Sequence, residues 1–344
     1  MRRLLVMTAA VLMLLGVMPT TAAGQGVIPK TPWGAPDLQG IWDFNTLTPL
    51  ERPSEFEERE FLTEEEASQM VQTVLESEGW DARYSDPQQD VEGAYNQFWT
   101  DRITNLSADR RTSLIVKPRD GKLPALTAAA YEREQAWRAT WQRPIRAPVL
   151  LAALFGINPA RGPEDFGLSE RCLVGYSSGP PINGGTYNSN LQIFQTRGHV
   201  VLYTEMIHEA RVVPLDGRPH VSPAIRQWLG DARGHWDGDT LVVESVNFTP
   251  KRASFYPNAT DAFGSGEALH LTERFSRVDI ETLRYEYTVD DPVTFTSPFT
   301  VSLTMQRSTG PIFEYACHEG NYGLLNALAG ARAQERVVND FVSR

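Results

Sequence analysis

Hydrophobic and polar residues alternate in several short segments between residues 190 and 317. In VSLTMQR, Val301, Leu303 and Met305 would face one side of a strand, and the polar residues between them would face the other. The segment TLRYEYTV at 282–289 repeats this alternation. A period of two residues is typical of antiparallel strands with one buried face, so this region is predicted to form a β-sheet.

About nine such segments follow one another without an intervening helix, and turn signals such as Asp237-Gly238 separate them. A meander of this kind closes as a lipocalin-like β-barrel or folds as a sandwich. The barrel is preferred because closure removes exposed sheet edges, so the predicted fold class is mainly β with helical additions. The predicted strands are LQIFQT, HVVLYTEMI, ARVVP, GHW, TLVVESV, LHLTERFSR, TLRYEYTV, FTVSLTMQ and IFEYAC.

Helical patterns lie before and after this region. Thr63 and the three glutamates that follow it suit the N-terminus of one helix, and residues 127–143 predict a second, capped by Thr127. The segment YGLLNALAGARAQERVVNDFV predicts a C-terminal helix that covers one end of the barrel. The Trp- and Pro-rich segment near the N-terminus is interpreted as an arm that wraps the main body, with a short strand at Gly40–Phe44 as the alternative.

The N-terminus has the pattern of a signal peptide over residues 1–24. Arg2 and Arg3 precede an apolar run that is too short for a comfortable membrane span, and small residues follow it. The mature protein is therefore expected in the periplasm or outside the cell, without a stable membrane span; the alternative is a retained N-terminal anchor. Residues 25–171 are predicted as an arm and mixed helical and strand region, forming one compact unit with the barrel region at 172–344.

Composition narrows the classes of partner and cofactor. The chain of 344 residues is 41% hydrophobic, enough for a full core, and its net charge of −11 argues against nucleic-acid binding. It contains no GxGxxG motif before a helix, no P-loop and no GxSxG elbow, so no cofactor is predicted. No metal is predicted either, because no metal-binding spacing connects the candidate ligands His208, His220, His235, Glu267 and His270.

The chain has two cysteines, Cys172 and Cys317. In an oxidising compartment an even count favours a disulfide, which would join the first and last segments of the predicted barrel. The competing interpretation is a reactive thiol at Cys317 beside His318 and Glu319.

Several long blocks resemble those of a large group of exported bacterial proteins, most of which are uncharacterised. The resemblance extends over nearly the whole mature chain and is compatible with export, a β-rich body and paired cysteines. It implies no substrate or reaction, and no catalytic residue is transferred from it. The blocks are TPWGAPDLQGIWDF, RTSLIV, LPALT, ARVVPLDGRPH, IRQWLGDARGHWDGDTLVVES, LHLTERFSRVD and EYACHEGNYGLLNALAGARA.

Candidate acid–base residues lie on the predicted strands. If residues 200–212 form one strand, His208 shares its even face with apolar residues, either as a core histidine or as a catalytic one. Glu273 lies among apolar residues of LHLTERF, where burial would raise its pKa toward use as a general acid unless an arginine such as Arg211 pairs with it. His318 and Glu319 form a second candidate pair if the chain turns at Gly320; the alternative is a loop that caps the C-terminal helix.

Two functions from different classes fit these residues. The first is a binding module whose barrel mouth holds a small apolar or aromatic molecule. The second is a cofactor-independent lyase, isomerase or hydrolase that uses His and Glu as acid and base. A third hypothesis, a structural envelope protein, predicts a filled barrel. The catalytic candidates are His318, Glu319, His208 and Glu273, and the substrate-binding candidates are Arg211, Tyr203, His270, Arg274 and Trp236.

Overall fold

The computed structural model describes most of the chain. The described residues are 28–77, 83–88, 90, 103–140, 162–163, 168–169, 171–175, 177–185, 187–250, 253–254, 262–263 and 266–342. The signal peptide predicted for residues 1–24 lies outside them.

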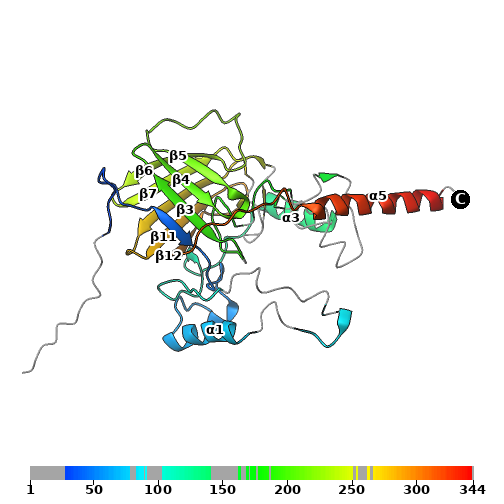
Figure 1. The fold of residues 1–344 in the computed structure, drawn as a ribbon, viewed down its shortest axis with the longest axis horizontal. Coiled ribbons are helices and arrows are strands. Elements are labelled where there is room, and N and C mark those ends of the chain that lie inside the picture. The colour runs from blue at the N-terminus through cyan, green and yellow to red at the C-terminus, as the bar shows by residue number, and fades with distance from the viewer. Residues whose placement is uncertain are drawn as a thin grey trace, which may run out of the picture.

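Most strands belong to one strongly curved antiparallel sheet (Figure 1). Their hydrogen-bonded order is β5-β4-β3-β1-β12-β11-β10-β7-β6, and β2 pairs with β12 beside this path. This nearly closed sheet confirms the predicted barrel. The strands are β1 (Gly40–Asp43), β2 (Ile115–Lys117), β3 (Asn190–Gln195), β4 (His199–Thr204), β5 (Ala210–Pro214), β6 (Asp231–Asp237), β7 (Thr240–Val246), β10 (His270–Arg277), β11 (Thr282–Asp290) and β12 (Phe299–Arg307), with β8 (Ala253–Ser254) and β9 (Ala262–Phe263) as a separate parallel pair.

The barrel closes where β5 meets β6, the two ends of the strand order. Gly234 of β6 lies against β5 and the residue that follows it: a Cβ atom at Gly234 would lie 2.8 Å from Val213 Cγ1 and 2.7 Å from Leu215 Cδ2. No ladder of hydrogen bonds joins β5 to β6 within the described part of the chain. The missing side chain at Gly234 therefore lets the two strands approach and close the barrel by packing.

The predicted alternation places apolar side chains inside the barrel. In β10, β11 and β12 every second residue is buried, and the aromatic residues Phe275, Tyr285 and Tyr287 are at most 1% exposed. The polar residues between them lie on the outer wall, where Arg274 pairs with Asp237 at 2.9 Å. The chain's own side chains thus fill the part of the barrel interior that these three strands line.

The N-terminal arm is a strand of the barrel and not a wrapping peptide, which corrects the preferred sequence interpretation. β1 pairs with both β3 and β12, and Trp42 has no exposed surface. The Arg277 guanidinium lies 4.5 Å from the Trp42 ring centroid and donates a 2.8 Å hydrogen bond to the carbonyl of Asp37. Gln195 bonds the backbone of the same segment, so residues 36–42 close this end of the barrel, which we call the arm end.

Two sequence predictions are wrong: a single strand over residues 200–212, and a strand over IFEYAC. Residues 200–212 form a hairpin, because the short 3-10 helix η5 (Met206–His208) reverses the chain between β4 and β5. Burial accordingly shifts from the even residues of β4 to the odd residues of β5. The segment IFEYAC has no strand structure: the N–H of Phe313 donates to the side chain of Glu205, which precedes η5, at 3.0 Å.

The turn and the helix caps follow local sequence signals. Asp237 pairs with Thr240 across a hairpin, and Gly238 has a φ of +59° at the first central position, which suits a type II′ turn. Thr63 and Glu66 form a capping box at α1 (Glu64–Glu76), and Thr127 Oγ1 accepts the N–H of Ala130 at the start of α3 (Ala128–Thr140). The short 3-10 helix η1 (Ser54–Phe56) lies before α1.

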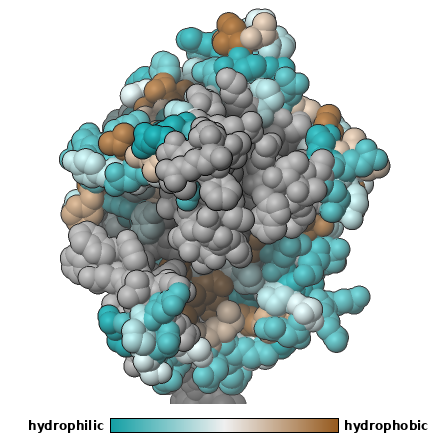
Figure 2. All heavy atoms as spheres, turned by 90° about the vertical axis from the view of Figure 1, so that its right-hand side faces the viewer, coloured by the Kyte–Doolittle hydropathy of each residue, from teal (hydrophilic) through white to brown (hydrophobic). Residues whose placement is uncertain are grey.

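The C-terminal helix α5 (Tyr322–Val342) extends away from the barrel and does not lie across its end (Figure 1). Figure 2 views the molecule from the side on which α5 projects; its described surface is mostly hydrophilic, with separate hydrophobic spots. Within the described ranges, no helix combines the length and the apolar character needed to cross a membrane.

Candidate functional site

Cys172 and Cys317 form a disulfide with a Cα–Cα distance of 5.9 Å, which confirms the predicted pairing. It joins the loop before β3 to the segment after β12, 145 residues further along the chain. Because both cysteines are bonded, neither is a reactive thiol. We call the region around this bond the disulfide end; it consists of the described residues within 168–190 and of residues 205–209 and 313–321.

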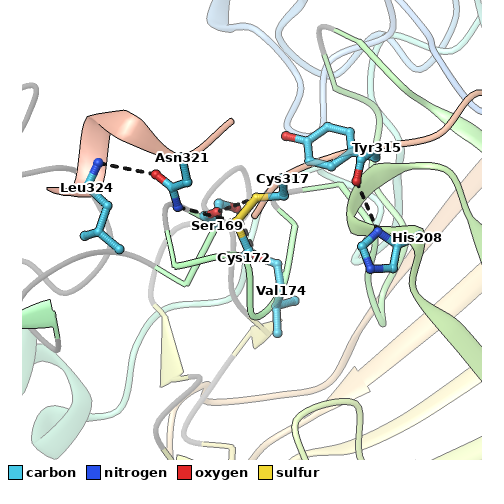
Figure 3. The surroundings of a disulfide bond; sticks show 8 residues. All are labelled: Ser169, Cys172, Val174, His208, Tyr315, Cys317, Asn321 and Leu324. Carbon is cyan, nitrogen blue, oxygen red and sulfur yellow. Dashed lines mark hydrogen bonds between the residues drawn. A yellow bond between two sulfur atoms is a disulfide. The ribbon is translucent and has the colours of Figure 1, made fainter. Parts of the chain in front are cut away.

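Two side chains beside η5 hold the segment that leads to Cys317. The Glu205 carboxylate is buried and accepts hydrogen bonds from Asn190 Nδ2 at 2.6 Å and from the N–H of Phe313 at 3.0 Å. His208 Nδ1 lies 3.1 Å from the carbonyl oxygen of Tyr315 (Figure 3). A carbonyl only accepts, so Nδ1 carries the proton, and Nε2 of this exposed ring is free to accept a hydrogen bond.

Aromatic side chains gather on the same segment. Phe313 is 66% exposed, which is unusual for a large apolar side chain anchored at its backbone. Tyr315 is partly buried, and this burial, together with the adjacent Tyr187 hydroxyl, raises the pKa of its phenol above the ordinary range. The disulfide end therefore carries an exposed aromatic ring, Phe313, on the segment whose backbone His208 contacts at Tyr315.

The backbone of the disulfide end is strained. Cys172, Asn188, Ile207 and His208 have φ values of +55°, +53°, +61° and +47°, in the left-handed region that residues with a Cβ atom seldom adopt. Ile207 is the extreme case, because a β-branched side chain crowds the backbone there. Each such residue costs about 1–3 kcal/mol and persists only where surrounding contacts enforce it. Here the disulfide and the Glu205 hydrogen bonds supply such contacts.

The buried Glu273 pairs with Arg211 inside the barrel. Arg211 donates two hydrogen bonds to its carboxylate, at 2.5 and 2.8 Å, and Tyr285 donates a third at 2.7 Å. Burial by itself lowers the pKa of Arg211, but the charge and the hydrogen bonds of Glu273, together with Tyr285 and Glu209, raise it overall. The Tyr285 hydroxyl in turn accepts the N–H of Ile182 at 3.1 Å. Glu273 is therefore paired with an arginine and is not a free general acid. Hydrogen-bond donors of the protein already satisfy its carboxylate.

His318 and Glu319 lie in the turn that precedes α5, and both are exposed. Asn321 caps this helix, since its Oδ1 accepts the N–H of Leu324 at 3.3 Å, and its Nδ2 approaches Cys172 Sγ at 3.5 Å (Figure 3). The capping-loop alternative thus describes the local structure. His318 and Glu319 belong to the disulfide end, as His208 does.

The other substrate-binding candidates lie on the outer wall of the barrel or against its core. Tyr203 and His270 are on the outer wall of the barrel, and so is Arg274, which the Asp237 carboxylate occupies. Trp236 packs against the core. Strand alternation shows which face of the sheet a residue occupies, but it does not show which other residues lie next to that face. Residues that the alternation grouped therefore lie in different places in the structure.

A histidine–carboxylate pair went unnoticed in the sequence. His220 Nδ1 lies 2.9 Å from Asp231 Oδ2, and Arg233 Nη1 donates to Asp231 Oδ1 at 2.7 Å. The two partners are 11 residues apart and flank a turn, a spacing that matches no recognised motif. The hydrogen bonds of Glu205 could not be predicted from the sequence either. They depend on the chain reversal between β4 and β5, which the alternation of residues did not predict. Across the described residues, no group of three or more His, Cys, Asp or Glu is placed to hold a metal ion.

Comparison of the chain with protein-family models, with curated proteins and with solved structures finds no match.

Proposed function

We propose that this protein is an exported binding protein that takes up a small aromatic molecule at its disulfide end. The observation that carries the proposal is the exposed Phe313 ring, which stands on a segment whose backbone Glu205 and His208 hold by hydrogen bonds next to the disulfide. Strained backbone gathers at ligand clamps, where it forms part of a preorganised site.

The exposed groups define the ligand chemistry. Phe313 offers an apolar ring face that favours a second aromatic ring. Nε2 of His208 accepts a hydrogen bond, because Nδ1 already donates to Tyr315. A planar ring with one N–H or O–H donor, such as a phenol or an indole, fits both groups.

Binding is favoured over catalysis because two buried carboxylates, Glu205 at the disulfide end and Glu273 inside the barrel, are already held by protein donors. Both oxygens of Glu205 accept hydrogen bonds, from Asn190 and from Phe313. Glu273 is likewise held by Arg211 and Tyr285. A general base must be within reach of a substrate proton, and these two carboxylates are occupied by the protein itself.

Phenol and indole, titrated into the intact protein by calorimetry, test the proposal. His208→Asn should weaken binding, since Asn tolerates the left-handed backbone but lacks Nε2. Phe313→Ser should weaken it about tenfold, which corresponds to about 1.4 kcal/mol for one aromatic contact. Ile280→Ser is the matched control, because Ile280 is 54% exposed in the turn between β10 and β11. Absence of heat with both probes, or an equal loss in the control, would contradict the proposal.

The His220–Asp231 pair favours a second candidate function, the cofactor-independent hydrolase. Asp231 fixes the His220 ring and leaves Nε2 as an acceptor, the state that a general base requires. Hydrolysis of p-nitrophenyl acetate tests this candidate. His220→Gln should abolish the activity, whereas His199→Gln, on the exposed outer wall, should retain it. An activity that survives in His220→Gln would remove this candidate.

A further inference from the structure

The outer wall of the barrel has an apolar region on β1, β3, β4 and β5. Phe194 is aligned with Val201 and Val201 with Val212 in one row across three strands. The next row aligns Ile41 with Gln192, Gln192 with Tyr203, and Tyr203 with Ala210. We call the apolar members of these rows the outer apolar face: Ile41, Phe194, Val201, Tyr203, Ala210 and Val212.

This face differs from the remainder of the outer wall. The outward positions of β10, β11 and β12 are polar or charged, as in Arg274, Glu286 and Ser302, and this is the normal pattern for a sheet with one solvated side. On the outer apolar face, Phe194 is 46% and Val212 is 58% exposed. β3, β4 and β5 lie side by side in Figure 1. Neighbouring apolar side chains left in water mark a surface that another molecule covers.

The charge of the chain restricts what that molecule is. The six residues of the face carry no charge, whereas the whole chain has a net charge of −11. Nucleic acid and anionic membranes require Lys or Arg at the contact, and a basic partner requires carboxylates. None of these groups belongs to the face. The surface that complements the outer apolar face is itself uncharged and apolar. A second copy of this chain supplies such a surface.

We propose that two copies of this chain form a twofold-symmetric dimer through the outer apolar face. In a twofold contact the same patch meets itself, so any contact between two different residues occurs twice, once in each direction across the axis. An axis near Val201, the middle of its row, sets Phe194 of each copy against Val212 of the other. Two chains with a net charge of −11 repel each other, and a contact through this uncharged face brings no pair of like-charged side chains together.

Sedimentation velocity on the intact protein over a range of concentrations tests the dimer. Val212→Glu and Phe194→Glu each place a charge in the proposed contact and should raise the dimer dissociation constant by more than about a hundredfold. Ser276→Glu is the matched control, since it adds the same charge to the polar wall opposite Arg284 and should leave the dimer intact. Circular dichroism and thermal unfolding establish that each variant is folded.

Three results would overturn the proposal. The first is a wild-type protein that stays monomeric at every accessible concentration. The second is a dimer that Val212→Glu and Phe194→Glu do not weaken. The third is a monomer that binds neutral phosphatidylcholine vesicles and loses this binding in Val212→Glu, which would assign the face to a lipid surface.

Discussion

Glu273 has no exposed surface, yet its carboxylate accepts three hydrogen bonds from Arg211 and Tyr285. The pair also crosses the barrel from β5 to β10, two strands that are not neighbours in the sheet. Removing one member leaves the other as an uncompensated buried charge. The pair is thus placed to stabilise barrel closure, at the position where the sheet has no ladder of hydrogen bonds.

Glu273→Leu should therefore lower the free energy of unfolding by about 3–5 kcal/mol, because Arg211 would lose its partner. Urea denaturation measures the change. The double variant Arg211→Met with Glu273→Leu should recover most of the loss, since it leaves no buried charge unpaired. A loss below about 1 kcal/mol in the single variant would show that water reaches the pair.

The buried phenols of Tyr285 and Tyr287 should make the stability of the barrel depend on pH in the alkaline range. Burial raises both pKa values well above the ordinary value of 10.0, and the Glu273 charge adds to this effect. In the unfolded chain both phenols ionise near pH 10, whereas the folded barrel keeps their protons. The folded state then binds more protons, so stability is fully present below about pH 10 and falls as the pH rises above it.

The measurement is urea denaturation at increasing pH, together with the ultraviolet absorbance of tyrosinate. Tyr287→Phe should reduce the fall in stability, because it removes one ionisable group from the interior. A phenolate signal for these buried tyrosines near pH 10 without loss of the fold would contradict the expectation.

At the scale of elements, β1 determines the shape of the arm end. From the sequence, a strand at Gly40–Phe44 was only the alternative to a wrapping arm, yet β1 lies between β3 and β12 and completes the barrel. Arg277 fixes the approach to β1 through Trp42 and the carbonyl of Asp37. Burial lowers the pKa of Arg277, and the nearby Arg307 adds to this effect.

Arg277→Ala should lower stability by about 1.5–3 kcal/mol, because a charged hydrogen bond and a cation–π contact are both lost. Limited proteolysis should then cleave the segment before β1 first. Arg274→Ala is the control, since Arg274 and Asp237 form an exposed pair that contributes below about 1 kcal/mol. Equal losses in the two variants would show that Arg277 has no special part in holding the arm.

At the scale of the whole molecule, the disulfide closes a loop that contains every strand of the main sheet except β1 and β2. Its ends are 145 residues apart, and in the loop-entropy model such a link stabilises the fold by about 4–5 kcal/mol. The double variant Cys172→Ala with Cys317→Ala should lose stability of that order in urea denaturation. An unchanged midpoint would mean that Glu205 and His208 alone hold the segment at 313–315.

The sequence predicted much of the barrel and less of the candidate site. Strands β10, β11 and β12, the caps at Thr63 and Thr127 and the Cys172–Cys317 pair all follow from local pattern or from a simple count. Of the candidate residues, His208, His318 and Glu319 share the disulfide end, while Tyr203, His270 and Arg274 lie on the outer wall. Alternation reports which side of a strand is buried, and it carries no information about what faces that side.

By itself the sequence determined the features whose physical causes act over a few residues. Strand periodicity, helix capping and the Gly238 turn belong to this class, because each depends on neighbouring side chains and backbone angles. The tertiary structure decided the remainder through contacts between distant residues. The Gln195 side chain bonds the backbone of Leu38 across 157 residues, and Glu205 bonds that of Phe313 across 108. Such contacts depend on chain reversal at η5 and on barrel closure at Gly234, which no local pattern encodes.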